Sequence, residues 1–381
     1  MGMTDVHGTV ADGYAGVREE FAAALAEGDT GGAQLAVYAD GARVVDLWAG
    51  DGVTGDTLTG VYSSTKGATA LVVALLVQDG ALDPDEPVAA HWPGFAAAGK
   101  VGITLRDVLT HRSGVIGVDG GLSPAELADD RVIAARVEAQ RPYWRPGSAY
   151  GYSGFVGFAI AGEVVRRVTG RTLQELYEER IRAPYGLDLY LGLPEDQEHR
   201  YREVLPGRAD PEERAAFWAN VPGPQSITGI GFALNSAPPL DQVAFLNTRR
   251  VRALGQASAG GLGSARGLAG LYAAAAFGLA GRPPLLKPDT LAEFAQPHST
   301  GGDLVAGPQA RYALGFQATG LRYPFLSARA FGHNGSAGSE AFADPYGGFA
   351  VGYTRRRFAF DWTYPEHDRL AAAVARAREA R

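Results

Sequence analysis

Ser63 and Lys66 are the residues whose types and spacing point most directly to chemistry. They open a predicted helix over 63–78, in which residues three positions apart lie about 60° apart around the axis and share a face. Ser64 and Lys66 lie about 200° apart, so the helical phase selects Ser63 as the nucleophile. A serine hydroxyl needs a base to attack a carbonyl carbon, and a lysine whose pKa is lowered by burial can be that base. Free backbone N–H groups at the helix start would face an oxyanion on the substrate.

The alternative for this segment is a capped helix that carries a solvated lysine. Lys66, however, precedes an apolar stretch from Ala68 to Val77, and such a stretch is typical of a buried helix. A buried lysine beside a serine favours the catalytic interpretation, because perturbed titratable groups cluster at functional sites.

Two tyrosines lie in a Gly-bounded turn, Pro146–Gly154, that precedes an apolar helix. A tyrosine in such a turn is more often a packed aromatic residue than a catalytic one. Beside a cationic lysine, however, the pKa of a phenol is expected to fall from about 10, and its oxygen could then carry a proton. Tyr150 and Tyr152 are both candidates, and their spacing alone does not separate them.

A third candidate segment, Gly332–Gly338, enters the strands near the C-terminus and contains His333, Gly335 and Ser336. An isolated histidine is usually structural. The glycines around this one would let a ligand approach the backbone closely, as a strand lining a site requires. The N–H of Ser336 would then be a second oxyanion donor beside that of Ser63.

The elements that must position these residues alternate between strands and helices. Apolar alternation around Asp40-Gly41 predicts a β-hairpin over 34–38 and 43–48, and 342–353 predicts further strands. Helical periodicity covers 14–27, 103–109 with Thr104 as its cap, 153–168, 172–181, 262–277 and a surface helix from Glu366. The charged, proline-broken stretch 196–214 predicts an exposed excursion or lid. Strands at both ends with helices between them indicate a sheet closed by the termini and an inserted helical region.

Composition narrows the classes of function. The 381 residues include no cysteine, so a thiolate metal site and a cysteine nucleophile are excluded. The seven histidines lack ligand spacing and no phosphate loop or dinucleotide fingerprint occurs, so we expect no metal and no cofactor. A net charge of −7 without a basic run argues against nucleic acid and against an anionic membrane. The N-terminal residues lack the pattern of a secretory signal, so a cytoplasmic protein is expected.

Three ordered segments, Tyr62–Ala70, Ile103–Gly114 and Phe331–Asp344, resemble the serine β-lactamase and penicillin-binding-protein superfamily. Within it they resemble the class C branch, and most of all the family VIII carboxylesterases. The resemblance implies an α+β, β-lactamase-like fold, with a mainly antiparallel sheet flanked by helices and an inserted helical region. It implies one catalytic unit over 1–381, whose α/β part comes from about 1–65 and 300–381 and whose helical part spans roughly 66–300.

The same resemblance implies roles for the candidate residues. Ser63 would be the acylated nucleophile, and Lys66 and Tyr152 would share the role of general base. His333 to Gly335 would stand where the lactamases carry Lys-Thr-Gly. Alignment on the Tyr-Ser-Asn turn of the relatives selects Tyr152 and places Tyr150 on the substrate-binding side. Candidate walls of an apolar acyl pocket are Trp144, Phe155, Trp218 and Phe331, with core packing as the alternative for each.

The sequence also departs from the family pattern. Gly154 replaces the asparagine that contacts the amide side chain of a lactam substrate, and His333 replaces the lysine that holds its carboxylate. The stretch Arg355–Trp362 departs as well and has no functional explanation. These departures favour a hydrolase of small carboxylic esters. An acyltransferase or an amide or D-peptide hydrolase on the same fold is the alternative, ahead of a β-lactamase or a non-catalytic sensor, and the oligomeric state stays open.

Overall fold

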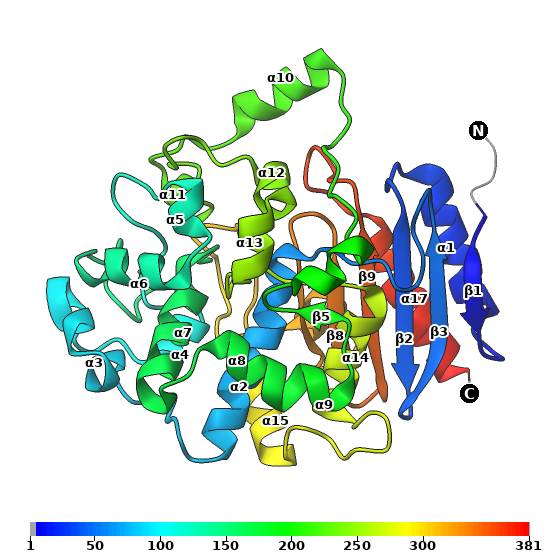
Figure 1. The fold of residues 1–381 in the computed structure, drawn as a ribbon, viewed down its shortest axis with the longest axis horizontal. Coiled ribbons are helices and arrows are strands. Elements are labelled where there is room, and N and C mark those ends of the chain that lie inside the picture. The colour runs from blue at the N-terminus through cyan, green and yellow to red at the C-terminus, as the bar shows by residue number, and fades with distance from the viewer. Residues whose placement is uncertain (1–4, 381) are drawn as a thin grey trace.

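A computed structural model describes residues 5–380, and its centre is a six-stranded antiparallel sheet (Figure 1). The strands lie in the order β1-β3-β2-β9-β8-β7. Their bounds are β1 His7–Val10, β2 Ala33–Ala39, β3 Ala42–Ala49, β7 Phe331–Asn334, β8 Glu340–Asp344 and β9 Phe349–Arg355. Because β2 pairs with β9 along their whole length, the two ends of the chain close one sheet. The predicted α+β fold, with a mainly antiparallel sheet, is confirmed.

The hairpin between β2 and β3 turns at the predicted dipeptide. Asp40 and Gly41 have φ of +51° and +78°. Both residues therefore lie in the left-handed region, which a two-residue hairpin turn of type I′ requires and which aspartate and glycine tolerate.

Helices cover the two faces of the sheet. On the outer face, α1 (Ala15–Glu27) lies beside α17 (Glu366–Glu379), the predicted C-terminal helix, which buries Leu370 and Val374 against the sheet. On the inner face, α14 (Ala265–Ala276) packs against β2, β8 and β9. This helix lies within residues 66–300, the range predicted for the helical part. It packs against the six-stranded sheet, however, and so belongs to the α/β part.

The rest of the chain between β3 and β7 is mostly helical and lies to one side of the sheet (Figure 1). Its central helix is α2 (Thr65–Gln78), nearly all of whose residues are buried, and a small sheet of β4 (Thr59–Gly60), β6 (Leu262–Gly263) and β5 (Leu189–Tyr190) lies near it. The remaining helices are α3 Val88–His91, α4 Leu105–Leu109, α5 Pro124–Leu127, α6 Asp130–Glu138, α7 Val156–Thr169, α8 Leu173–Tyr177, α9 Ala183–Tyr185, α10 Pro211–Asn220, α11 Ile227–Gly231, α12 Gln242–Asn247, α13 Arg249–Leu254, α15 Pro288–Ala295 and α16 Thr319–Arg322.

Several boundaries differ from the predicted ones. Thr104 caps α4 as expected, accepting a hydrogen bond from the Asp107 N–H. The helix predicted from 153 begins only at Val156, because residues 152–155 form an extended turn at the site described below. The 196–214 excursion holds a 3-10 turn, Glu195–Arg200, and the start of α10, which projects from the body (Figure 1).

Within residues 5–380, no helix is both long enough and apolar enough to cross a bilayer. The prediction that the N-terminal residues lack a secretory signal rests partly on residues 1–4, which lie outside the described residues.

Close contact between α14 and the sheet depends on Gly352 in β9. A Cβ at this position would lie 2.4 Å from the Ala265 carbonyl oxygen and 2.5 Å from the Ala269 nitrogen. We therefore predict that Gly352→Ala lowers the free energy of unfolding by about 1–3 kcal/mol, because the helix backbone must move away.

Gly16→Ala is the matched control, since Gly16 lies in α1 with open space around it. This change should raise the free energy of unfolding by about 0.5–1 kcal/mol. Urea unfolding of both variants measures the difference, and equal effects would contradict the packing explanation.

Candidate active site

Ser63 lies in a 3-10 turn, Tyr62–Ser64, that runs directly into α2. The preceding residue, Tyr62, has φ +45°, an uncommon conformation for a residue with a side chain. Its hydroxyl donates to the Gln242 carbonyl oxygen at 2.7 Å, and its ring meets the edge of Phe358. These contacts hold the strained turn and present Ser63 to a pocket.

Two side chains meet at the Ser63 hydroxyl. Lys66 Nζ lies 3.1 Å from Ser63 Oγ, and the Tyr152 hydroxyl donates to the same oxygen at 2.8 Å. Ser64 faces away, donating to the His333 carbonyl oxygen at 3.1 Å. The structure therefore brings Ser63, Lys66 and Tyr152 together and separates Ser64 from them, as the helical phase indicated.

Lys66 is fully buried, with 0% of its surface exposed. Its Nζ donates to the carbonyl oxygens of Gly154 at 2.8 Å and Ser258 at 3.0 Å. In the described part of the chain no carboxylate forms an ion pair with it. Burial without a counter-ion lowers the pKa of Lys66 well below its ordinary value.

The loop that carries the Ser258 carbonyl is held by Asp130, a partly buried carboxylate that the sequence analysis did not single out. Asp130, the first residue of α6, accepts from Gln256 Nε2 at 2.8 Å and from the Ala257 N–H at 3.0 Å. Gln256 Oε1 in turn accepts from the Ser258 N–H at 2.9 Å. Burial raises the pKa of Asp130 to about 6. Asp130 lies far from Gln256 and Ala257 in the sequence, so no local spacing indicated these contacts.

Tyr152 is fixed by its backbone and by its ring. Its N–H donates to Asp303 Oδ1 at 3.2 Å, and its ring stacks on Tyr312 with centroids 5.9 Å apart. The expectation of a lowered phenol pKa is wrong: burial is the dominant effect and raises the pKa of Tyr152 well above 10. Tyr150 instead donates its hydroxyl to the Ala310 carbonyl oxygen, away from Ser63.

His111 supports the tyrosine turn, in line with a structural role. Its Nδ1 accepts from the Ser153 N–H at 3.2 Å, and its ring centroid lies 5.0 Å from that of Tyr152. Burial is the main cause that lowers the pKa of His111 well below its usual range.

His333 lies on β7 and lines the pocket. Its Nδ1 is 2.7 Å from the Asn334 carbonyl oxygen, which can only accept, so Nδ1 carries the proton. Nε2 is buried and has no hydrogen-bond partner in the described structure. Burial is the main cause that lowers the pKa of His333 to about 3, so the ring is neutral near pH 7.

Gly335 allows the end of β7 to approach the nucleophile turn. A Cβ there would lie 2.2 Å from the Val61 carbonyl oxygen and 2.4 Å from Ser339 Oγ. No acceptor within residues 5–380 takes the backbone N–H of Ser63 or of Ser336. Both amides thus remain available to a ligand, as an oxyanion site requires.

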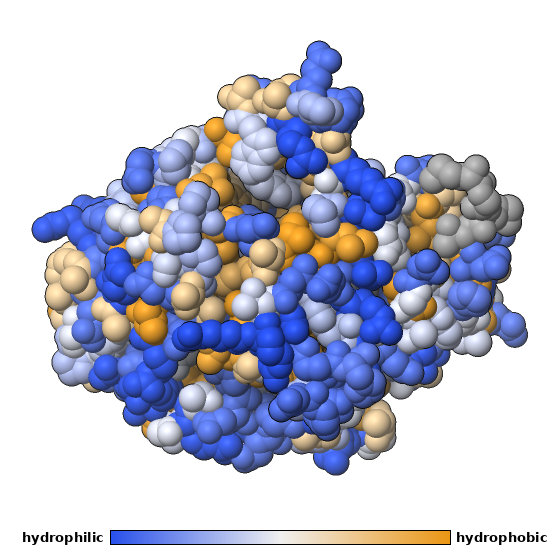
Figure 2. Space-filling view, turned by 45° about the horizontal axis from the view of Figure 1, so that its top comes forward, coloured by the Kyte–Doolittle hydropathy of each residue, from blue (hydrophilic) through white to orange (hydrophobic). Residues whose placement is uncertain are grey.

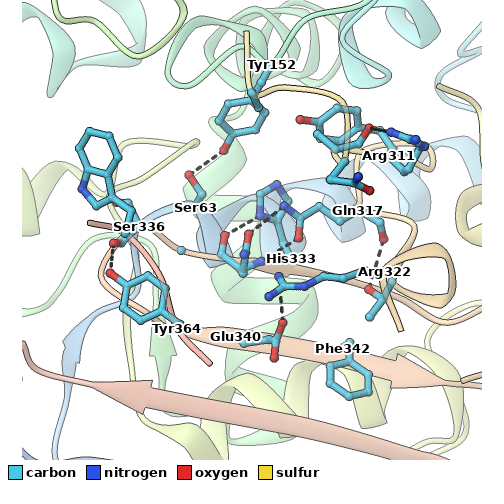
Figure 3. A pocket seen from close by; sticks show the side chains of 18 of the residues that line it. Ser63, Tyr152, Arg311, Gln317, Arg322, His333, Ser336, Glu340, Phe342 and Tyr364 are labelled. Atoms are coloured by element: carbon cyan, nitrogen blue, oxygen red, sulfur yellow. Dashed lines mark hydrogen bonds and ion pairs between the residues drawn. The ribbon is translucent and has the colours of Figure 1, made fainter. Parts of the chain in front are cut away.

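These residues line a pocket of about 490 Å³. Ser63 lies between two of its sides, with Ser336 and Tyr364 on one and Arg311 and Gln317 on the other (Figure 3). Its further lining includes Phe232, Tyr312, Arg322, Glu340, Phe342 and Trp362. Residues 306–318 contribute many of these side chains from irregular structure, and the sequence there has no periodicity from which they could be predicted. The described residues contain no cluster of metal-ligating side chains.

Four of the five residues expected along the substrate, Tyr150, Trp144, Phe155 and Phe331, are not among those that line this pocket, which corrects the prediction for these four. Phe331 is fully buried against Tyr272 and Phe316, deeper along β7 than His333. Tyr150 and Trp144 pack in an apolar cluster together with Tyr152 and Tyr312. Phe155 packs edge-on against Phe245. Trp218 lies on α10 and is 54% exposed.

Comparison with known proteins agrees with this geometry. The model of the β-lactamase family matches residues 17–376, almost the whole chain. The chain belongs to the β-lactamase family. The resemblance predicted from its three motifs is thereby confirmed.

Solved structures of this family are similar along their whole length. EstA from Arthrobacter nitroguajacolicus Rue61a shares 37% identity, with a TM-score of 0.87 and 98% of each chain covered. A family VIII carboxylesterase shares 34% identity, with a TM-score of 0.86 and coverage of 98% of this chain and 100% of that one.

Curated relatives match over a shorter region. The esterase/β-lactamase LipL of Mycobacterium tuberculosis is 35% identical over 209 residues, which are 52% of this chain and 48% of LipL. Penicillin-binding protein 4 of Amycolatopsis lactamdurans is 33% identical, over 47% of this chain and 49% of that protein. The matches thus span about half the length of these relatives. Esterases and penicillin-binding proteins both occur among these relatives.

The neutral state of His333 gives a prediction for acid stability. Because folding lowers its pKa from 6.5 to about 3, the unfolded chain binds a proton that the folded chain rejects between these values. Stability linked to His333 is therefore complete above about pH 6.5 and is lost as pH falls toward 3. We predict that His333→Gln makes this pH dependence shallower, by up to about 1.4 kcal/mol per pH unit.

Urea unfolding from pH 7 to 4 measures this slope, and His199→Gln, which removes an exposed imidazole, is the control. An unchanged slope in His333→Gln would show that His333 binds its proton equally well in the folded chain.

Proposed function

We propose that this member of the β-lactamase family is a hydrolase that cleaves carboxylic esters through an acyl-enzyme formed on Ser63. The observation that carries the proposal is the position of Ser63 Oγ, which lies 3.1 Å from Lys66 Nζ and 2.8 Å from the Tyr152 hydroxyl at the wall of a pocket. This arrangement places a base and a proton donor on one nucleophile.

The hydrogen bonds around Lys66 divide the roles between these groups. A neutral amine has two hydrogens and one lone pair, and the carbonyl oxygens of Gly154 and Ser258 take the two hydrogens. The lone pair then faces the Ser63 hydroxyl. Tyr152 keeps its own proton, because burial raises its pKa, and donates it to Ser63 Oγ.

Acylation follows from this arrangement. Lys66 takes the hydroxyl proton while Ser63 Oγ bonds to the ester carbonyl carbon, and the N–H groups of Ser63 and Ser336 hold the negative charge on the carbonyl oxygen. The bond to the leaving alkoxide then breaks, the alkoxide takes the Tyr152 proton, and the Lys66 ammonium reprotonates Tyr152. Water repeats the sequence on the acyl-enzyme, releasing the acid and restoring Ser63.

Two departures from the family pattern support esters over β-lactams. A Cβ at Gly154 would lie 2.7 Å from the Gly231 carbonyl oxygen of α11, so the asparagine of lactam-binding relatives would displace this helix. His333, which replaces their lysine, is neutral near pH 7 and offers no positive charge to a lactam carboxylate.

Intact-mass spectrometry during turnover of p-nitrophenyl esters tests the proposal. Wild type should show a transient acyl adduct and steady p-nitrophenol release. Ser63→Ala should show no adduct and should lower kcat/KM by at least about a thousand-fold, because the nucleophile is absent.

Ser64→Ala is the matched control, because it removes the neighbouring hydroxyl that faces β7. It should retain the adduct. Full activity in Ser63→Ala would contradict the proposal, and equal kcat/KM for a matched anilide would replace the ester assignment with an amidase.

A further inference from the structure

Two segments without a role in the chemistry meet above the pocket. The Phe217 ring on α10 lies 5.2 Å from the Trp362 ring and 6.0 Å from the Phe360 ring, measured between centroids. Trp218 lies 6.4 Å from Trp362 and meets it edge to face. The excursion around α10 and the stretch that ends at Trp362 thus share one aromatic ledge, formed by Phe217, Trp218, Phe360 and Trp362.

This ledge exposes large aromatic surface. No residue of α10 is buried, although the helix is well capped by Asp210. Trp218 is 54% exposed and Trp362 is 41% exposed. Apolar surface is visible in the hollow below the projecting helix (Figure 2). Exposed apolar surface that gathers at one place commonly marks a ligand site.

The ledge is continuous with the pocket of Ser63. Trp362 belongs to the ledge and also lines the pocket. Tyr364, two residues later, donates its hydroxyl to the carbonyl oxygen of Ser336. The loop that carries Trp362 is thereby anchored beside the amide proposed to hold the oxyanion.

The position of Tyr152, the proton donor, determines which part of the substrate reaches the aromatic ledge. Tyr152 protonates the leaving oxygen in the proposed mechanism, so the leaving group lies toward Tyr152. In Figure 3, Tyr364 and Ser336 lie across Ser63 from Tyr152. The acyl chain therefore extends toward Trp362. The other side of the pocket carries the polar side chains of Arg311 and Gln317.

We propose that the aromatic ledge of Phe217, Trp218, Phe360 and Trp362 is a subsite for the acyl chain, which makes esters of medium-length, unbranched acids the preferred substrate class. This inference rests on the proposed ester hydrolysis at Ser63. Flat rings on two separate segments bury a straight chain along its length, and each further methylene placed there adds apolar contact.

The test compares kcat/KM for p-nitrophenyl octanoate and acetate, both used below the concentration at which the octanoate aggregates. Wild type should prefer the octanoate. Trp218→Ala should lower the octanoate-to-acetate ratio about ten-fold, because contact with several methylenes is lost. Trp218→Phe, which keeps an aromatic ring, should retain most of the ratio.

Tyr346→Ala is the control, since it removes an exposed aromatic side chain from the turn between β8 and β9, outside the pocket. Its activity and ratio should match those of wild type. Thermal unfolding of each variant checks that the fold is retained.

The outcomes separate the two proposals. An unchanged ratio in Trp218→Ala, with both esters hydrolysed, overturns the acyl subsite and leaves the esterase proposal in place. An equal fall in Tyr346→Ala also overturns the subsite, because the effect would then not belong to the ledge. Failure of wild type to hydrolyse either ester overturns both proposals.

Discussion

The amine of Lys66 donates to two carbonyl oxygens, those of Gly154 and Ser258, and has the Ser63 hydroxyl as its third neighbour. Each of these two carbonyl oxygens accepts one hydrogen of the amine. Neither carries the negative charge that would stabilise an ammonium. Removing an ammonium from water without a counter-ion is costly, so the surroundings favour the amine with its lone pair directed at the nucleophile. The chemical proposal follows from this single arrangement, since a protonated Lys66 could not accept the serine proton.

The fold positions these groups from distant parts of the chain. Helix α2 supplies Lys66, the turn before α7 supplies the Gly154 carbonyl, and Asp130 holds the loop that supplies the Ser258 carbonyl. Glycine at 335 lets β7 approach the serine turn, where a side chain would collide with backbone. Burial of Lys66 and the positive φ of Tyr62 both cost stability, and packing elsewhere in the molecule must offset them.

Features of this structure that depend on local sequence patterns could be predicted from the sequence. Helical phase separated Ser63 from Ser64, Asp40-Gly41 located the hairpin turn, and strands at both ends indicated the closed sheet. Most of the residues that line the pocket could not be predicted in this way. Which side chains reach the pocket depends on how deeply each is buried and on segments of irregular structure. Phe331 carries the right side-chain type on the right strand, yet it lies within the core. Arg311 and Tyr312 come from a segment without periodicity, and the sign of the Tyr152 pKa shift depends on burial that spacing does not reveal.

The protonation state of Lys66 is the most direct test of this account, and the sequence makes it measurable, because the chain contains only three lysines, Lys66, Lys100 and Lys287. Selective ¹³Cε-lysine labelling would give three NMR signals, and Lys66→Arg would identify the one that belongs to Lys66. We predict that this signal titrates well below the ordinary lysine value of 10.5. Titration near 10.5 would mean that Lys66 is an ammonium at neutral pH and would contradict its role as the base.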